Sequence, residues 1–273
     1  MKLRVAKLAI VAILFLAIQI PHAHSQGTLV LYPLVNLVIL DGTYTTAKEW
    51  SDTIALPMEA GVSGIVGYFA AKYDSNYLYV VWDFVGCQAP YGGTDDRNEV
   101  GMYLDPSNQK SNSLNQNVYR LDFADVGGFL VNIYASEGTS SGGWTDWTTY
   151  TGTDIKAALS YSFSPNSKTT HMIVEARIAL AFASLKTHVP GTIGLYLYMK
   201  DATHTDLAAD YPGDANFKIP STWGSLQTTS VPISEFPEVV PVLLLALLVV
   251  ATFLRRTRKS SLSGAYSSRP HSV

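Results

Sequence analysis

The stretch that most constrains the fold of this chain is residues 70–84, AAKYDSNYLYVVWDF. It predicts two β-strands joined by a tight turn at Asp74-Ser75-Asn76, because such short polar side chains hydrogen-bond their own backbone in turns. The second strand, residues 77–84, is rich in tyrosine, valine and tryptophan, which fit a pleated and half-buried surface. A hairpin this apolar needs a second sheet to cover it, so the stretch predicts a layered β protein.

Similar short strand patterns, separated by turn signals and with almost no helical pattern, fill residues 26–226. Such a series predicts one all-β domain, an antiparallel β-sandwich of the jelly-roll-like kind. Cys87 is the only cysteine, which excludes an intrachain disulfide. The net charge of −3 and the lack of a basic block within the domain give no support to nucleic-acid binding.

The first residues have the composition of a secretory signal peptide. Three basic residues precede an apolar core over residues 8–20, and Ala23 and Ser25 form the small-x-small pattern of a cleavage site. We therefore predict a signal peptide over residues 1–25, with an uncleaved signal anchor as the alternative.

A second apolar run, residues 239–254, ends directly in a basic cluster. It is slightly shorter than the ~20 residues that usually span a bilayer, and a buried core helix is the alternative. Basic residues beside a span stay in the cytoplasm. The pattern predicts a linker over residues 227–238, a transmembrane helix over 239–254 and a disordered cytoplasmic tail over 255–273. The protein would then be a single-pass cell-membrane protein with its main domain extracytoplasmic.

Several short motifs occur in an order that resembles family-nine carbohydrate-binding modules and the related DOMON-type β-sandwiches. In chain order they are Asp41-Gly42, Glu49-Trp50, Tyr73-Asp74, the run DRNEVGMYLD over residues 96–105, Val174-Glu175-Ala176 and Trp223-Gly224. The likeness runs from residue 41 to about 226. It implies a β-sandwich of the carbohydrate-binding-module type, in which Glu49, Trp50, Glu99, Glu175 and Trp223 belong to the framework.

The C-terminal segment carries a second resemblance. Ser234-Glu235-Phe236-Pro237 before an apolar run and an arginine cluster is similar to the C-terminal sorting signals of archaeal surface proteins. The likeness implies a cell-surface location. We expect a retained anchor, and the alternative is processing by a sortase-like enzyme.

The best sugar-stacking candidates are Trp144 and Trp147, which lie in a loop rich in glycine, serine and threonine. Flat aromatic faces can stack on the apolar faces of sugar rings. Tyr150 in the same loop and Trp82 in the hairpin complete the predicted ligand-binding set. The alternative is that these side chains pack within the sandwich, as large aromatic residues mostly do.

Two further kinds of site follow from the resemblance. Related modules bind structural calcium, for which Asp41, Asp95, Asp96 and Asp105 would supply the carboxylate oxygens that this ion prefers. The alternative is that these residues cap turns or lie in solvent.

Some relatives bind haem b, and the candidate axial ligands in this chain are Met102 and Lys200. The alternative is core packing for the methionine and solvent for the lysine. His171 is expected at the surface.

No Gly-x-Ser-x-Gly, His-Glu-x-x-His or phosphate-loop motif is present, so we expect no enzyme activity. The sequence thus predicts a membrane-anchored surface module that binds a polysaccharide or cell-surface glycan. The alternatives are a haem b electron-transfer domain and a structural surface-layer or assembly component.

Overall fold

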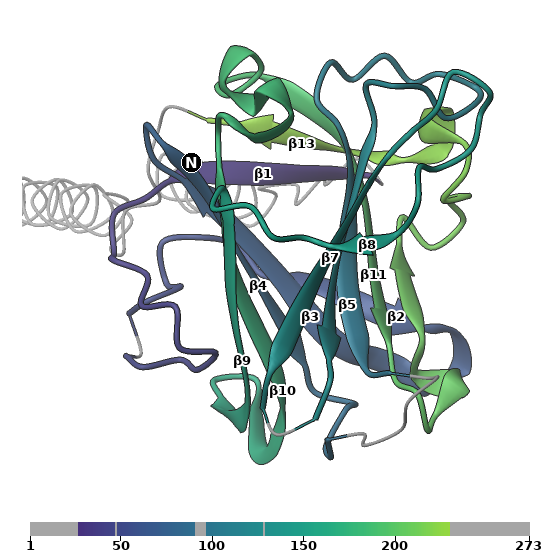
Figure 1. Cartoon of the computed structure of the whole chain (residues 1–273). Coiled ribbons are helices and arrows are strands. Elements are labelled where there is room, and N and C mark those ends of the chain that lie inside the picture. The colour runs from purple at the N-terminus through teal and green to yellow at the C-terminus, as the bar shows by residue number, and fades with distance from the viewer. Residues whose placement is uncertain (1–26, 47, 91–96, 128, 230–273) are drawn as a thin grey trace, which may run out of the picture. The chain divides into compact units, whose positions relative to one another are not determined.

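The computed structural model describes residues 27–229, except residues 47, 91–96 and 128 (Figure 1). The described residues form thirteen strands and four short 3-10 helices. The strands are β1 (Thr28–Pro33), β2 (Leu56–Ala60), β3 (Gly64–Tyr73), β4 (Tyr77–Phe84), β5 (Glu99–Asp105), β6 (Tyr119–Asp125), β7 (Val131–Glu137), β8 (Thr148–Thr149), β9 (Ile155–Ser164), β10 (Ser167–Ala179), β11 (Thr192–Lys200), β12 (Ala209–Tyr211) and β13 (Gly224–Thr228). The 3-10 helices are η1 (Gly61–Ser63), η2 (Phe182–Thr187), η3 (Thr205–Leu207) and η4 (Pro220–Thr222).

The strands form two layers, as predicted for a β-sandwich. Sheet I has the order β8-β7-β6-β5-β11-β13, with β12 also paired to β11, and sheet II has the order β9-β10-β4-β3, with β2 also paired to β3. Strand β1 joins them, because residues 28–31 pair with β13 and residues 32–33 pair with β3. It runs parallel to both neighbours, which departs from the fully antiparallel sandwich that we predicted.

The hairpin predicted from residues 70–84 is confirmed as β3 and β4. One carboxylate oxygen of Asp74 accepts hydrogen bonds from the backbone N–H groups of Asn76 and Tyr77, at 2.7 and 2.8 Å. Trp82 points from β4 into the space between the sheets, where it is fully buried. Its ring centroid lies 5.2 Å from that of Phe69 and 5.1 Å from that of Phe123. The prediction that Trp82 contacts a ligand is therefore wrong, because its side chain is part of the core.

The motif residues hold the segment between β1 and β2 over the outer face of sheet II. Glu175 on β10 accepts a hydrogen bond from Trp50 Nε1 at 2.9 Å with one carboxylate oxygen. Its other oxygen accepts from the backbone N–H groups of Gly42 at 3.0 Å and Asp41 at 3.2 Å. Glu49 accepts from the backbone N–H of Ile39 at 2.6 Å. These motifs thus have the framework role that the resemblance implied.

Two ion pairs lie near the segment between β1 and β2, and all four of their side chains are fully buried. Lys72 Nζ lies 2.7 Å from an oxygen of Asp52. The ring of His171 contacts the carboxylate of Asp83, so the prediction that His171 lies at the surface is wrong. On β10, His171 has the same parity as Ile173, so its side chain lies on the outer face of sheet II.

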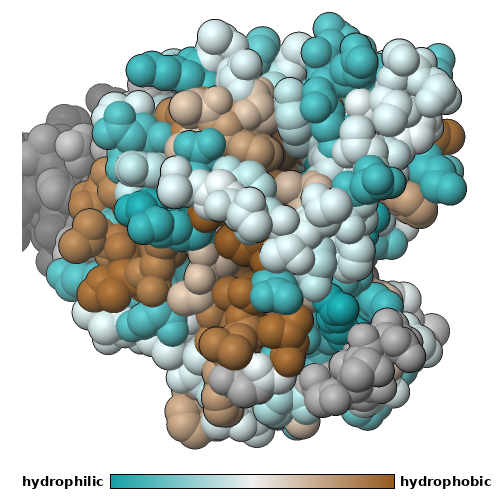
Figure 2. Space-filling model, in the orientation of Figure 1, coloured by the Kyte–Doolittle hydropathy of each residue, from teal (hydrophilic) through white to brown (hydrophobic). Residues whose placement is uncertain are grey.

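The surface over the segment that follows β1 is partly apolar (Figure 2). Val35, Leu37 and Ile39 are exposed there. Residues 1–25 and 239–254, predicted as a signal peptide and a transmembrane helix, lie outside the described residues, and so does the tail 255–273. Within the described part of the chain, no helix is long and apolar enough to cross a bilayer. Strand β13 ends at Thr228, so the folded part includes the first two residues of the predicted linker.

Candidate functional site

The outer face of sheet I, which points away from sheet II, carries a cluster of polar and aromatic side chains. It arises from strand alternation, because successive side chains on a strand point to opposite faces. Every second side chain of β5, β6 and β11 points into the core. The residues that point outward are Glu99, Gly101, Tyr103, Arg120, Asp122, Tyr196, Tyr198 and Lys200. The three strands are neighbours, so residues distant in the sequence share one surface.

The carboxylate of Asp122 organises this cluster from a fully buried position. One oxygen accepts a hydrogen bond from the Tyr198 hydroxyl at 2.6 Å. The other accepts from Arg120 Nε at 2.5 Å and from Trp147 Nε1. Burial raises the pKa of Asp122, while the guanidinium of Arg120 and the other donors oppose that rise. The buried Asp122 carboxylate therefore fixes the orientation of the Arg120 and Trp147 side chains, which lie nearer the surface.

Gly101 makes this arrangement possible. It lies opposite Asp122 on β6 and opposite Tyr198 on β11. A Cβ atom at this position would lie 2.3 Å from Cε1 of Tyr198, far inside the contact distance of two carbon atoms. The tyrosine ring thus crosses the bare backbone of β5 to reach the carboxylate of Asp122.

Trp147 is the only one of the five tryptophans that is exposed, with 40% of its surface accessible. Its ring stacks on Tyr134 of β7, with centroids 4.1 Å apart and an angle of 16° between the planes. The guanidinium of Arg120 lies 5.3 Å from the Trp147 ring centroid, and that of Arg97 lies 5.3 Å from the Tyr134 centroid. The result is a fixed aromatic surface flanked by two cations.

The other two predicted aromatic residues of this loop do not join Trp147. Trp144 is half-buried and packs edge-on against Tyr103, with centroids 5.2 Å apart. Tyr150 directly follows Thr149 of β8, which pairs with the outward-facing Tyr134, so the Tyr150 side chain points to the inner face of sheet I. There it packs against Phe182 and the core. Packing therefore accounts for Trp144 and Tyr150, as the alternative interpretation had it.

Glu99 lies at the rim of the cluster, beside Lys200 on β11. Burial and the nearby Asp122 carboxylate raise the pKa of Glu99, while Lys200 and Arg120 oppose the rise. The face thus offers a carboxylate acceptor and cationic donors next to an aromatic ring. Stacking and charge-assisted hydrogen bonds are the interactions that recognise a hydroxylated ring with apolar faces.

Sequence reasoning missed most of these groups. Arg97, Arg120, Asp122 and Tyr134 were not among the predicted site residues, and Glu99 was assigned to the framework. The signal available in the sequence was the recurrence of polar residues at every second position of otherwise apolar strands, which places them on the outward side. Their spatial grouping depends on the pairing of β5 with β6 and β11, which no local pattern specifies.

The described structure does not bring the predicted calcium ligands together. Asp41 lies in the exposed segment over sheet II and accepts a hydrogen bond from the backbone N–H of Thr43 at 2.8 Å. Asp105 is buried at the end of β5 in sheet I and accepts from the backbone N–H of Lys110 at 3.1 Å. Asp95 and Asp96 lie outside the described residues. Among the described residues, no group of three acidic, histidine or cysteine side chains is placed to hold a metal ion.

The predicted haem ligands lie on opposite faces of sheet I. Met102 is fully buried in the core, whereas Lys200 has the outward parity of Tyr196 and Tyr198. A sheet separates the two side chains, so they cannot ligate the same iron. The prediction of this axial pair is therefore wrong.

Neither a protein-family model nor a curated protein matches this sequence. Among solved structures, the chain is similar to a carbohydrate binding module family 9 (CBM9) from Caldicellulosiruptor kristjanssonii in complex with cellotriose. The TM-score is 0.51 at 15% identity, over 76% of this chain and 99% of that chain. A second structure of a CBM9 from the same organism, in complex with glucose, gives a TM-score of 0.49 at 14% identity, over 74% and 96% of the two chains. The first likeness confirms the predicted β-sandwich fold of the carbohydrate-binding-module type.

Proposed function

We propose that this chain is a carbohydrate-binding module without catalytic activity, and that it binds a polysaccharide or cell-surface glycan on the outer face of sheet I. The observation that carries the proposal is the exposed ring of Trp147, stacked on Tyr134 and tied by its Nε1 to the buried Asp122. A sugar ring would place its apolar face on the exposed part of the indole. Its hydroxyl groups would meet Arg120 and Glu99. The shared fold supports the same ligand class.

Pre-organisation strengthens the proposal. Ordering one flexible side chain on binding costs about 0.5–1.5 kcal/mol. Trp147 is already fixed by a stacked ring and a hydrogen bond, and Arg120 is fixed by the carboxylate of Asp122. Little further ordering is required when a ligand arrives, so even weak stacking and hydrogen bonds contribute to affinity.

The buried Asp122 carboxylate is placed to hold the binding surface and not to act on a substrate. Glycosidases generally place two carboxyl groups on either side of the scissile bond. On the outer face of sheet I, Asp122 is fully buried and already accepts three hydrogen bonds, so it cannot reach a substrate. Of the other carboxylates on this face, Glu99 lies beside Lys200, and Asp210 on β12 accepts a hydrogen bond from the Tyr196 hydroxyl at 2.7 Å.

We further propose that the module is held at the cell surface by residues 239–254 after cleavage of residues 1–25. The support is the sequence pattern of both segments. Proteolysis of intact cells tests this topology. We expect external protease to degrade the domain and to leave the basic tail protected; protection of the domain would contradict the proposal.

Glycan-array binding followed by calorimetry with cello-oligosaccharides tests the function. We expect Trp147→Ala to weaken binding by about two- to tenfold, since an aromatic contact is worth about 0.5–1.5 kcal/mol and a tenfold change is 1.4 kcal/mol. Phe163→Ala is the matched control, because Phe163 is an exposed aromatic residue on β9. Unchanged binding by a folded Trp147→Ala protein would refute the assigned face. A wild-type protein that binds no glycan would favour a structural surface component.

A further inference from the structure

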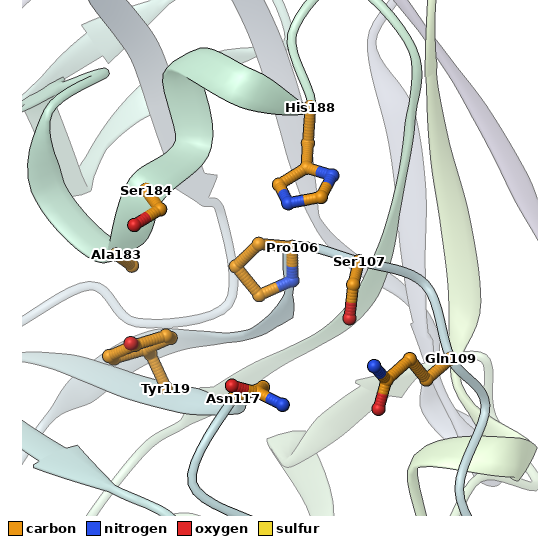
Figure 3. Close-up of a pocket in the computed structure, with 8 residues that line it drawn as sticks. All are labelled: Pro106, Ser107, Gln109, Asn117, Tyr119, Ala183, Ser184 and His188. Carbon is orange, nitrogen blue, oxygen red and sulfur yellow. The ribbon is translucent and has the colours of Figure 1, made fainter.

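A separate hollow of about 230 Å³ lies at the other end of β5 and β6, away from Glu99 (Figure 3). It is open to solvent and is lined by the loop after β5, the start of β6, the turn η2 and the residue that follows η2. The residues that matter for its chemistry are Ser107, Gln109, Asn117, Tyr119, Ser184 and His188. Tyr119 pairs with the inward-facing Leu104, so this hollow lies on the other side of sheet I from Trp147.

Three of the polar side chains around the hollow have no partner among the described residues, while the Ser107 hydroxyl donates to Asp105 at 3.2 Å. Figure 3 shows Asn117, Gln109 and His188 directed toward the shared space. Within the described part of the chain, none of these three side chains forms a hydrogen bond, although the neighbouring backbone groups do. The ring of Tyr119 packs edge-on against Phe182, with centroids 5.6 Å apart, which leaves its other surface along the hollow.

The backbone around this hollow is unusually strained. Ala183 and Ser184, which line it, have φ values of 52° and 55°. Asn108 and Lys110, on either side of Gln109, have φ values of 49° and 52°. The left-handed conformation costs an L-residue roughly 1–2 kcal/mol. Four of the five non-glycine residues with positive φ in the described chain thus gather at one place, and such strain concentrates at functional sites.

We infer that this hollow is a second ligand site that takes one neutral, polyhydroxylated ring such as a monosaccharide unit. Among the described residues, no carboxylate, ammonium or guanidinium group lines it, which favours an uncharged ligand. Its volume is below the about 300–1,000 Å³ of pockets for drug-sized ligands, which matches a single ring. Amide and imidazole groups supply donors and acceptors for hydroxyls, and Tyr119 supplies an apolar surface. The inference adds a site to the proposed function without using Trp147.

Ligand-observed saturation-transfer NMR on the full chain tests this site, with D-glucose, D-galactose and N-acetylglucosamine as probes. The first protein is Trp147→Ala, which removes the outer-face ring. We expect a saturable signal for at least one sugar to remain in it. The signal should fall at least fivefold when Asn117→Ala and Gln109→Ala are added, and it should persist when Gln116→Ala is added instead. Gln116 is an exposed neighbour outside the hollow, which makes it a matched control.

Each outcome bears on one site. If the Trp147→Ala protein gives no saturable signal, or if Asn117→Ala with Gln109→Ala leaves the signal unchanged, the hollow is not a sugar site. If the wild-type signal is unaffected by Trp147→Ala but is lost in the Asn117→Ala/Gln109→Ala protein, the hollow is confirmed and the outer-face proposal fails. Both substituted residues are exposed and free of side-chain hydrogen bonds within the described chain, so the fold should survive.

Discussion

Glu175 should make the stability of this domain fall as the pH rises. Burial raises the pKa of its carboxyl group from 4.5 to about 7, with the nearby Glu49 adding to the rise and the donors from Trp50, Asp41 and Gly42 opposing it. A carboxyl group whose pKa is higher in the folded state binds its proton more tightly there. The folded state is therefore favoured most below pH 4.5, and that advantage disappears as the pH rises to about 7 and beyond.

The magnitude follows from the two pKa values. One pKa unit corresponds to about 1.4 kcal/mol, so the difference between 4.5 and about 7 amounts to roughly 3 kcal/mol in the free energy of unfolding. Most of it, about 2–3 kcal/mol, falls between about pH 5 and about pH 8. Typical domains have only 5–15 kcal/mol of stability, so the effect is easily measured.

The assay is urea unfolding of the wild type and Glu175→Gln at both pH values. Glutamine stays neutral, and it has one acceptor oxygen where Glu175 uses two, so the variant starts with a constant penalty. The pKa of His171 is also raised, because its hydrogen bonds to Asp83 and to a backbone carbonyl outweigh the opposing effect of burial. The wild type and the variant share this histidine, so its contribution cancels in the difference between their unfolding free energies. We expect the wild type to lose about 2–3 kcal/mol relative to the variant as the pH rises. A difference that stays constant or grows in favour of the wild type would refute the reasoning.

Two further substitutions test the packing. Lys72→Met leaves the buried Asp52 carboxylate without its counter-ion, and we expect a loss of about 3–5 kcal/mol in urea unfolding; a loss under about 1 kcal/mol would show that the pair is not desolvated. Gly101→Ala forces the ring of Tyr198 away from Asp122, and we expect a loss of about 1–3 kcal/mol, seen as a lower Tm, together with weaker glycan binding. A Tm and an affinity equal to the wild type would contradict the close approach at Gly101.

Local patterns predicted the elements whose causes are local. The turn at Asp74 forms because its own carboxylate satisfies the next backbone N–H groups, so three residues suffice to specify it. The motifs around Glu49, Trp50 and Glu175 were assigned to the framework by resemblance, and their hydrogen bonds across the outer face of sheet II agree with that role. The parallel pairing of β1 was missed, because it joins residues 28–33 to β3 in one sheet and to β13, the last strand of the described chain, in the other.

The candidate site shows the opposite case. One loop carries Trp144, Trp147 and Tyr150, and the sequence treats them as equivalent. Tertiary contacts distinguish them, because Trp144 packs against Tyr103, Trp147 stacks on Tyr134, and Tyr150 packs against the core. Exposure is a property of the neighbours and not of the residue, so composition alone does not identify the aromatic side chain that is available to a ligand.

By itself the sequence determined the β class, the central hairpin, the framework motifs and the expectation that an aromatic residue of the 136–153 loop contacts the ligand. Only the tertiary structure decided that Trp147 is the exposed ring, that Arg120 and Asp122 contact it, and that Glu99 lies on the same face of sheet I. It also placed Met102 and Lys200 on opposite faces. The physical reason is that alternation along a strand is local, whereas the pairing of β5 with β6 and β11 depends on contacts up to about a hundred residues apart in the chain.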